Sequence, residues 1–508
     1  MAEWEGDGIG SGIRAKRIQI VGRQRSSVES CACTSCHPCA ELAGREVSSP
    51  LAFRHLSRAA IPLYAEAMNE NRKGNATPTI SRVCPDGTLI ELIYKPDANE
   101  TALATRTPDG RVSVEQMIDL PTGERLVPYS AANNLIASGC VKLPSDVGEF
   151  GDVGDLVEAI HAFLRRYVAL SPVFEEIAAY YVLLSWVHDA FNELPYLRFR
   201  GDYGTGKTRA LLAVGSLCYK PFFASGASTV SPIFHILDAF GGTLILDEAD
   251  FRFSDATAEL TKILNNGNAR GMPVLRTMTN RHRELNPQAF KVYGPKLVAM
   301  RESFSDKALE SRFLTENTGR PMPDGIPIHT PDSLALEATQ LRNRLLAWRF
   351  HARFIVGPDV GRLIHGVEPR INQTALALLS LIDDPEVRQR IEAELIGVDA
   401  ERRDERSSSY EAAMVTALDA AFRESEGPNA AIASVTTRFN MLAGENLGAA
   451  MTNRWVGAFV RNRLRLRTMK TKGVYVVPAE ERTRVAALAA RHGVLQEVLN
   501  KNPGSLDP

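Results

Sequence analysis

The sequence predicts an α/β protein built around a parallel sheet, with further domains on both sides of it. Two stretches carry this prediction. Gly201–Thr208 fits the pattern G-x-x-x-x-G-K-[ST] and lies between a short strand, 196–200, and a helix that continues from Arg209. About forty residues later, the run 243–248 has the apolar composition of a buried parallel strand and ends in two carboxylates.

The first stretch has the composition of a phosphate-binding loop. Glycines leave room for the backbone N–H groups to turn onto phosphates. Lys207 is expected to contact the β- and γ-phosphates, and the hydroxyl of Thr208 to contact Mg²⁺. The following helix N-terminus adds a favourable partial charge. We therefore expect nucleotide binding, rather than a bare Gly-rich turn, from Gly201, Asp202, Tyr203, Gly204, Thr205, Gly206, Lys207 and Thr208.

The second stretch supplies the acids that such a site needs. Ligands of open α/β sheets lie at the carboxyl ends of the strands, where Asp247 and Glu248 stand. Asp247 is expected to support Mg²⁺, and Glu248 to orient and activate the attacking water. The alternative is that both acids cap the next helix. With Lys207, they are the predicted catalytic residues for hydrolysis of ATP in the presence of Mg²⁺.

The composition indicates the general class of protein. A chain of 508 residues with 44% hydrophobic and 23% charged residues is typical of a soluble protein of several domains. Its net charge of −1 excludes a basic protein overall, although basic residues can still gather locally. The most apolar run, 177–187, is far shorter than the ~20 residues that cross a bilayer. The N-terminus lacks a secretory signal pattern, so we expect a cytoplasmic protein that does not contact membranes.

Changes in composition along the chain predict five parts. They are a flexible leader with a cysteine cluster, 1–45; a small α+β domain, 46–150; the nucleotide-binding domain with two lead-in helices, 151–325; a helical lid or bundle with a linker, 326–405; and a winged helix-turn-helix with a tail, 406–508. The β-rich unit at 75–130 has Pro-Asp-Gly turns between alternating stretches, which predicts an antiparallel arrangement. It carries no evident catalytic set, and docking or oligomerisation is its expected role, with nucleic-acid binding second.

The leader holds a compact set of soft ligands. Thiolates at short spacing suit Zn²⁺, or less well an iron–sulfur cluster. The alternative is a reactive cysteine cluster in a poorly ordered leader, because the chain has no second pair of ligands at the usual separation. The predicted zinc ligands are Cys31, Cys33, Cys36 and Cys39.

A basic hairpin is predicted before the next core strand. Its arms are 272–278 and 288–293, and its tip carries Arg281, His282 and Arg283. Cations at that place can contact a nucleic-acid phosphate backbone in a central pore. The alternative is an ordinary solvated loop.

Arg312 follows the core strand 296–300 and is the predicted arginine offered to the γ-phosphate of a neighbouring subunit. The alternative is that Arg312 forms an ion pair with Glu310. Arg270 is a second candidate for the arginine that contacts the neighbour's γ-phosphate.

The order of these motifs resembles the AAA+ P-loop ATPases with a hairpin before sensor 1, notably superfamily-three-like helicases of viruses, plasmids and integrated elements, and primase-associated helicases of mobile elements. This resemblance implies an AAA+ core and a homo-oligomeric ring, with a hexamer as the expected form. The chain departs from the pattern at one place. A polar sensor-1 residue, commonly Asn, is expected after strand 296–300, where this chain has Arg301, Glu302 and Ser303.

The C-terminal part predicts a winged helix-turn-helix, with helices at 410–422, 434–442 and 453–464 before a two-stranded wing. Between 450 and 475 there are basic residues and no acid, a pattern that suits a recognition helix in the major groove with a wing on phosphates. Docking of a protein is the alternative. The predicted DNA-binding residues are Arg454, Arg461, Arg463, Arg467, Lys470 and Lys472.

These features predict an ATP-dependent DNA helicase or translocase that acts in replication of a mobile element, with single-stranded or duplex DNA as its partner. The alternative is a DNA-bound AAA+ switch ATPase that remodels a protein partner, in assembly or defence, without unwinding DNA.

Overall fold

The computed structural model describes residues 76–225, 228–247, 255–279, 285–304, 306–407, 409–443 and 450–494. Several predicted site residues lie outside the described residues, and their roles stay predictions: Cys31, Cys33, Cys36, Cys39, Glu248, Arg281, His282 and Arg283. Within the described ranges, no group of three or more His, Cys, Asp or Glu side chains is placed to hold a metal ion. No helix there is both long and apolar enough to cross a membrane.

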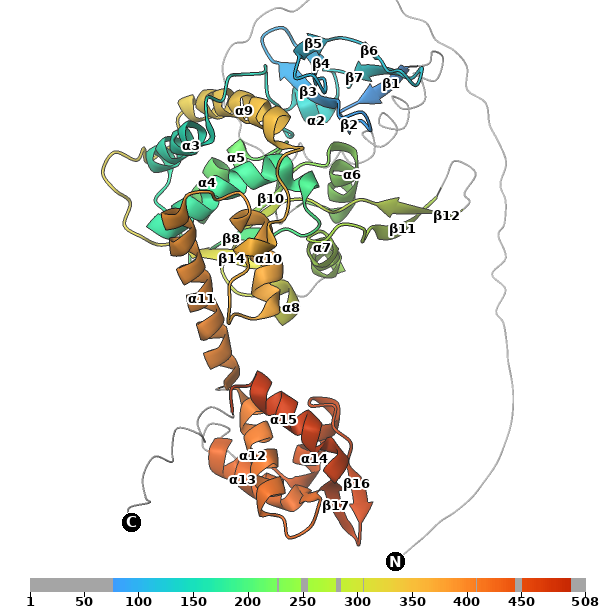
Figure 1. Ribbon diagram of the computed structural model, residues 1–508, viewed down its shortest axis with the longest axis vertical. Helices are drawn as coiled ribbons and strands as arrows, with labels where there is room; N and C mark the ends of the chain where they lie inside the picture. Colours follow the sequence, from blue (N-terminus) through green and yellow to red (C-terminus); the bar gives the residue numbers. More distant parts are fainter. Residues whose placement is uncertain are drawn as a thin grey trace, which may run out of the picture. The chain divides into compact units, whose positions relative to one another are not determined.

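The β-rich unit consists of two small sheets (Figure 1). The first is antiparallel, in the order β2 (Ser81–Val83), β3 (Leu89–Lys95), β4 (Glu100–Arg106) and β5 (Val112–Glu115). The second contains β1 (Ala76–Thr79), β7 (Arg125–Pro128) and β6 (Ile118–Asp119). Because β1 runs parallel to β7, the expectation of a wholly antiparallel unit is wrong. The long stretch of chain between these two strands permits a crossover that a tight turn would not allow.

Two helices follow the short α2 (Asn134–Ala137) and precede the central sheet, as predicted. α3 (Val153–Tyr167) begins where the carboxylate of Asp152 accepts from the backbone N–H of Asp155. α4 (Pro172–Val187) is buried on nearly every side because α3, α5 and α9 all pack against it. It is therefore a core helix, as its uninterrupted apolar sequence indicates.

The central sheet is parallel and five-stranded, in the order β14-β8-β13-β10-β9. Its strands are β8 (Tyr196–Arg200), β9 (Phe222–Ser225), β10 (Leu244–Asp247), β13 (Lys296–Met300) and β14 (Phe313–Asn317). The three strands predicted at 196–200, 243–247 and 296–300 are confirmed. So is the fold class, an α/β phosphate-loop core on a parallel sheet with a β-rich unit before it and helices after it.

The two faces of this sheet belong to different hydrophobic cores. In β13, Leu297 and Ala299 pack in the core that contains α4 and α5, whereas Val298 and Met300 pack in the core that contains α6 and α7. Burial on both faces explains why these strands are continuous apolar runs without alternation. The helices next to the sheet are η3 (His188–Ala190), α5 (Lys207–Leu217), α6 (Val230–Phe240), α7 (Asp255–Asn266) and α8 (Lys307–Glu310).

The predicted hairpin is present between α7 and β13. Its arms, β11 (Val274–Thr279) and β12 (Leu285–Phe290), pair antiparallel, and Figure 1 shows them projecting beside α6 and α7. The second arm begins at Leu285, earlier than the 288 expected from the sequence. Pro287 lies inside this arm. It is tolerated because β12 is an edge strand of a two-stranded sheet, where a residue without an N–H group can be accommodated.

Helices make up the chain from 333 to 407: α9 (Ser333–Ala352), η4 (Val360–Arg362), α10 (Pro369–Leu379) and α11 (Pro385–Ser407). The polar linker expected at the end of 326–405 is wrong, because α11 continues through it. Alternating acids and bases at 386–406 keep this helix soluble and support it by pairs one turn apart.

The C-terminal part has its own hydrophobic core. Its elements are α12 (Tyr410–Glu424), β15 (Ala430–Ala431), α13 (Ile432–Ala443), α14 (Asn453–Asn462), β16 (Met469–Thr471), β17 (Val474–Val477), η5 (Ala479–Glu481) and α15 (Arg482–Arg491). The three predicted helices and the two-stranded hairpin are present. The short β15 adds a third strand beside β17.

A buried charge cluster joins the β-rich unit to the central core. The Glu91 carboxylate in β3 is 2% exposed and accepts from Lys220 Nζ at 2.8 Å and from Arg349 Nε at 2.7 Å. The hydroxyl of Tyr219 also donates to it at 2.8 Å, and Asp189 pairs with the far side of the Arg349 guanidinium. Buried charges are tolerated when they are paired and hydrogen-bonded in this way.

Candidate nucleotide-binding site

The phosphate loop connects β8 to α5 at the carboxyl end of the sheet. Gly204 and Gly206 have φ of +70° and +87°, a region that favours glycine, and both leave open space where a side chain would stand. Gly201 is required for another reason. A Cβ there would lie 2.5 Å from Oγ1 of Thr318. The three glycines of the motif are thus where the backbone needs them.

Hydrogen bonds within the loop hold it in a compact turn. Lys207 Nζ donates to the carbonyl oxygen of Asp202 at 2.6 Å, and the hydroxyl of Thr205 donates to the same oxygen at 2.8 Å. Thr205 also contacts the hydroxyl of Thr318 at 2.8 Å, which ties the loop to the chain after β14. These contacts hold the loop in a defined turn, with Lys207 Nζ hydrogen-bonded to a backbone oxygen of the loop itself.

The two predicted Mg²⁺ residues are brought together. Thr208 begins α5, Asp247 ends β10, and the Thr208 hydroxyl donates to Oδ2 of Asp247 at 2.9 Å. Hydroxyl and carboxylate oxygens are the hard ligands that Mg²⁺ prefers, and Mg²⁺ commonly takes one or two protein ligands beside phosphate and water. These residues fit the ion predicted from the sequence.

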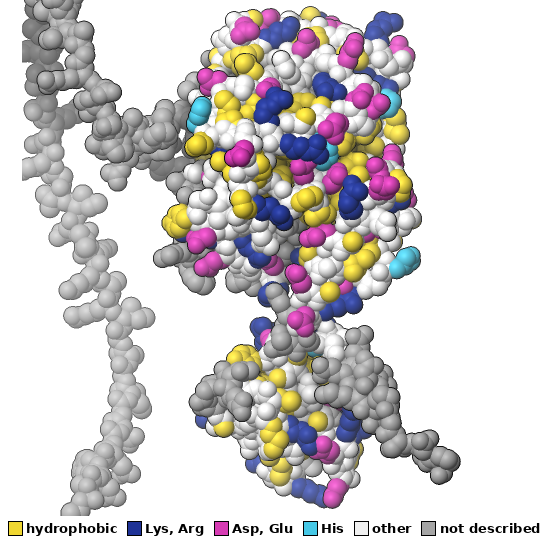
Figure 2. Space-filling view, turned by 90° about the vertical axis from the view of Figure 1, so that its left-hand side faces the viewer, with side chains coloured by type: hydrophobic (Ala, Val, Ile, Leu, Met, Phe, Trp, Pro, Cys, Tyr) yellow, Lys and Arg dark blue, Asp and Glu magenta, His cyan; other side chains and the backbone are white. Residues whose placement is uncertain are grey.

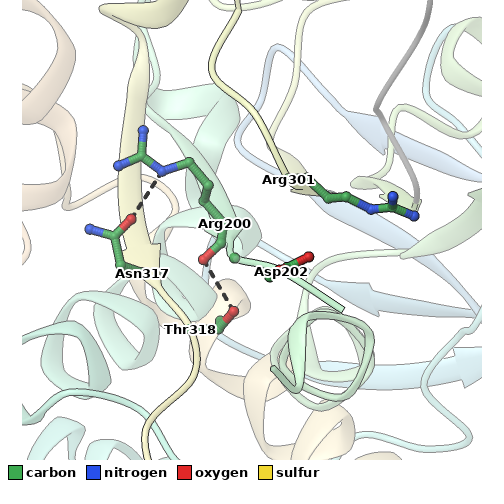
Figure 3. Close-up of a pocket in the computed structure, with 6 residues that line it drawn as sticks. Arg200, Asp202, Arg301, Asn317 and Thr318 are labelled. Atoms are coloured by element: carbon green, nitrogen blue, oxygen red, sulfur yellow. Dashed lines mark hydrogen bonds between the residues drawn. The ribbon is translucent and has the colours of Figure 1, made fainter. Parts of the chain in front are cut away.

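Two cavities open beside the loop. One of about 350 Å³ is lined by the loop together with Arg209, Asp247, Ala299 and Arg301. The other, of about 250 Å³, is lined by Arg200, Gly201, Asp202, Arg301, Asn317 and Thr318 (Figure 3). The sequence reasoning did not predict Arg301 as a site residue. Its position directly after the core strand 296–300 was the signal that could have found it.

The two arginines of the smaller cavity have different surroundings. Arg200 donates from Nε to Oδ1 of Asn317 at 3.0 Å and from Nη1 to the hydroxyl of Ser303 at 2.7 Å. The guanidinium of Arg301 lies over the ring of Tyr203, 3.5 Å from its centroid. Figure 3 shows the two side chains extending in different directions, with only that of Arg200 turned to Asn317.

Arg312 lies at the opposite end of the sheet from the phosphate loop. Phe313, the next residue, is level with Tyr196 at the start of β8, whereas the loop follows Arg200 at the end of that strand. At a rise of ~3.3 Å per residue, this separation exceeds ~10 Å along the sheet. Arg312 therefore does not lie at its own subunit's phosphate loop.

The predicted alternative for Arg312 is wrong. Glu310 pairs with Arg198 at 2.6 Å, and Arg312 donates instead to Oδ1 of Asn268 at 2.9 Å and to Oδ1 of Asn265 at 2.5 Å. Partial burial, with the charge of Arg370 nearby, lowers the pKa of Arg312. Arg270, the second candidate, lies over the Tyr293 ring, 5.4 Å from its centroid, and donates to the carbonyl of Asp189.

The described arms of the hairpin carry little charge of their own. Arg276 pairs with Glu259 at 2.6 Å and lies 4.5 Å from the Phe234 ring centroid, so its cation is directed at α6 and α7. The opposite face of the ribbon is exposed and uncharged. It consists of Leu275, Thr277, Leu285, Pro287 and Ala289.

The predicted DNA-binding residues of the C-terminal part are exposed on α14, on the segment after it and on the β16–β17 hairpin: Arg454, Arg461, Arg463, Arg467, Lys470 and Lys472. Lys472 and Gly473 form the turn of this hairpin. Arg463 differs from the others because its Nε pairs with Glu411 at 2.6 Å. Over the larger, upper body drawn in Figure 2, basic and acidic side chains are interspersed, so that face has no large single-sign field.

The sequence matches no protein-family model and no curated protein. Among solved structures, the chain is similar to the C-terminal region of NrS-1 at 10% identity, covering 77% of this chain and 96% of that one, with a TM-score of 0.33. It is also similar to the SCCmec type IV helicase Cch, at 13% identity over 81% and 99% of the two chains, with a TM-score of 0.32. It is also similar to Cdc6p of Pyrobaculum aerophilum, at 11% identity over 66% of this chain and 98% of that one, with a TM-score of 0.19. Likeness at this level decides neither fold nor function, so both rest on the geometry above.

Proposed function

We propose that this chain is a Mg²⁺-dependent ATPase of the AAA+ type that moves on or unwinds DNA in the manner of superfamily-three-like helicases, as a hexameric ring, for a mobile element. The contact between Thr208 and Asp247 carries the ATPase part of this proposal. The β11–β12 hairpin, inserted between the strand that ends in Asp247 and the strand β13 beside the phosphate loop, supports the DNA part.

In the proposed reaction each group has one task. Lys207 would move from the carbonyl of Asp202 to the β- and γ-phosphates. Thr208 and Asp247 would hold Mg²⁺, which supplies charge neutralisation at the transferred phosphoryl group. Glu248 would orient the attacking water and accept its proton. The domain that holds these groups is proposed to be 151–325.

The position of Arg312 supports assembly with further copies of the chain. An arginine that stabilises the transferred phosphoryl group must reach it, and Arg312 lies at the far end of the sheet from its own phosphate loop. A neighbouring subunit placed head to tail can receive it, and head-to-tail contacts close into rings. The site would be incomplete in an isolated subunit.

The DNA contacts are proposed for two places. Arg281, His282 and Arg283 would hold the strand at the hairpin tip, and the C-terminal part would bind duplex as a winged helix. In that part, α14 exposes Arg454 and Arg461, and the β16–β17 hairpin exposes Lys470 and Lys472. Such cations attract phosphates without regard to sequence.

Steady-state ATP hydrolysis tests this function. Wild type is compared with Arg281→Ala/His282→Ala/Arg283→Ala, each with and without single-stranded DNA. A DNA motor requires strong stimulation by single-stranded DNA that the triple variant loses. Turnover that ignores DNA in both proteins would contradict the motor.

A second candidate is a DNA-bound switch ATPase that remodels a protein. One observation favours it: the exposed face of the hairpin arms, with Leu275 and Leu285 71% and 76% exposed, has no charge and suits a protein surface better than a phosphate backbone. Substituting Leu275→Ser and Leu285→Ser separates the two candidates. A motor would keep its stimulation by single-stranded DNA, whereas a switch would lose its response to the partner that it contacts.

A further inference from the structure

The β16–β17 hairpin of the C-terminal part extends beyond the third strand of its sheet. β15 pairs with β17 only at Val476 and Val477, so the outer half of the hairpin is a two-stranded ribbon (Figure 1). The turn of this ribbon, Lys472 and Gly473, has positive φ at both residues, +46° and +87°. Turns of this kind match the natural twist of the two strands. The ribbon is therefore a defined projection.

One face of this ribbon carries an exposed aromatic ring. Tyr475 is level with Lys470, so these two side chains lie on the same face, whereas Val474 lies on the other. Tyr475 is 55% exposed, and Lys470 Nζ lies 5.9 Å from the centroid of its ring. The next two residues along β17 are buried in the core of the C-terminal part. A partner can therefore reach the ring of Tyr475 without any rearrangement of the fold.

The surface around Tyr475 is cationic. Residues 450–475 include seven basic residues and no acid. Arg461 of α14 reaches the base of the hairpin, where its Nη1 donates to the hydroxyl of Thr468 at 3.1 Å. This contact makes α14 and the hairpin one continuous surface. A ligand that complements this surface must be an anion that also offers flat apolar faces, and nucleic acid has both properties.

Stacking on Tyr475 requires a base that is not inside a duplex. Base pairs within a duplex present their edges in the grooves, while their faces are covered by neighbouring pairs. Unpaired bases expose their π-faces, and aromatic side chains bind these with little regard to sequence. The cations of α14 thus suit the phosphates of a duplex, and the ring of Tyr475 suits a base that has lost its partner.

We propose that the C-terminal part binds the junction between duplex and single-stranded DNA, with the ring of Tyr475 stacked on an unpaired base and Lys470 beside a phosphate of the same strand. The proposal rests on the DNA binding proposed above for this part and narrows it to a class of DNA structure. It would place the ATPase where duplex is opened.

Fluorescence anisotropy of the full-length protein tests the proposal with two DNA probes, a forked duplex with unpaired arms and a fully paired duplex of the same length. The triple variant at 281–283 serves as the background, so that the other proposed contact with single-stranded DNA does not contribute. Tyr475→Ala should weaken binding of the fork about tenfold and leave binding of the paired duplex within about twofold.

Two further variants separate the ring from other effects. Tyr475→Phe keeps the aromatic face and should bind the fork within about twofold of the background protein. Val474→Ala, on the opposite face of the same ribbon, is the matched control and should also stay within about twofold. Equal losses in Tyr475→Ala and Val474→Ala would overturn the assignment to the ring.

A photochemical probe reports the contact directly. A fork with 5-iododeoxyuridine at the first unpaired position should cross-link to Tyr475 under ultraviolet light, and mass spectrometry of the digested protein identifies the residue. The same base placed inside the paired duplex should give no cross-link at Tyr475. A cross-link at Tyr475 from the paired probe alone would overturn the proposal.

The outcomes separate this proposal from the DNA binding on which it rests. If the protein binds neither probe, the proposed DNA binding by the C-terminal part fails, and the role of Tyr475 fails with it. If it binds both and Tyr475→Ala weakens both equally, or neither, then only the role of Tyr475 is wrong. Binding of a polyglutamate peptide that Tyr475→Ala abolishes, with fork binding unchanged, would assign this surface to an acidic protein instead.

Discussion

The hydroxyl oxygen of Thr208 and a carboxylate oxygen of Asp247 lie 2.9 Å apart, although the two residues are 39 positions apart in the chain. They come from the first turn of α5, which follows β8, and from the last residue of β10; the strands β8 and β10 are not neighbours in the sheet because β13 lies between them. The fold thus brings together two hard oxygen ligands of the kind that the proposed Mg²⁺ would need. Catalysis benefits when such groups are already in place.

Removing one charge from this pair tests the metal role. Asp247→Asn keeps the shape and the hydrogen bond but loses the anion, so Mg²⁺-dependent ATP hydrolysis should fall at least about 100-fold, a loss of several kcal/mol of transition-state stabilisation. Lys207→Ala should lose nucleotide binding as well. Turnover measured across a Mg²⁺ titration checks both, with the exposed Glu115→Gln as control. Wild-type turnover by Asp247→Asn would exclude Asp247 as the metal ligand.

Arg312 should act in a neighbouring subunit. Arg312→Ala is expected to bind nucleotide normally and to hydrolyse it at least about 1000-fold more slowly, the range known for such arginines. Mixing it with Lys207→Ala should restore turnover, because mixed interfaces pair an intact phosphate loop with an intact arginine. Asn265→Ala, which removes one hydrogen-bond partner of Arg312 but keeps the cation, is the control for local structure. No recovery on mixing would contradict action between subunits.

The sequence predicted the parts of the site that are local in the chain. Gly201–Thr208 has fixed spacings that the backbone requires, and the apolar run before Asp247 has the composition of a strand buried on both faces. Arg301 was not predicted as a site residue, because only the placement of β13 between β8 and β10 brings it to the loop. Its position directly after the predicted strand 296–300 was the one sign of this in the sequence.

The sequence also did not predict which buried charged side chains pair with one another. Glu91 stands in the run Leu89–Lys95, where a charged residue would ordinarily face water, yet it meets Lys220 and Arg349 from distant elements. The alternative role of Arg312, an ion pair with the nearby Glu310, is wrong because Asn265 and Asn268 accept its hydrogen bonds instead. Pairings between distant segments follow from packing of the whole fold rather than from local pattern.

Glu91 should be a large stability determinant. Glu91→Gln leaves two buried cations without their shared anion, so unfolding free energy should fall by about 3–5 kcal/mol. Burial lowers the pKa of Lys220, an effect that Glu91 opposes, and the loss of Glu91 removes that compensation. Urea unfolding followed by circular dichroism checks this, with Glu115→Gln expected within about 0.5 kcal/mol of wild type. An unchanged midpoint for Glu91→Gln would show that the cluster is not a stability determinant.

Because the pKa of His161 is raised in the folded state, we expect the folded protein to lose stability in weakly alkaline solution. Burial disfavours its charge, but hydrogen bonds to Glu175 at 2.8 Å and Glu176 at 3.1 Å outweigh it and raise the pKa of His161 from 6.5 to about 9. The folded state holds the proton more tightly, so this stabilisation is complete below pH 6.5 and disappears as pH rises through 9.

The matched variant is His161→Gln, which keeps hydrogen-bonding capacity but does not titrate. Between pH 6.5 and 9, the urea midpoint of wild type should fall more than that of His161→Gln. Ring NMR signals of His161 should remain those of an imidazolium at about pH 7.5, below the raised pKa. A neutral ring at that pH would contradict the assigned ion pairs between α3 and α4.

The basic face of the C-terminal part should determine duplex affinity. Arg454→Ala/Arg461→Ala/Lys470→Ala removes three exposed cations, so duplex binding should weaken, and the slope of log K against log salt should become less steep by about 0.9 for each DNA phosphate that the variant no longer neutralises. Arg463→Ala is the matched control, because Arg463 is paired with Glu411 and should change the slope less. Fluorescence anisotropy across a salt series measures both quantities. An unchanged slope in the triple variant would assign this surface to a protein partner instead of DNA.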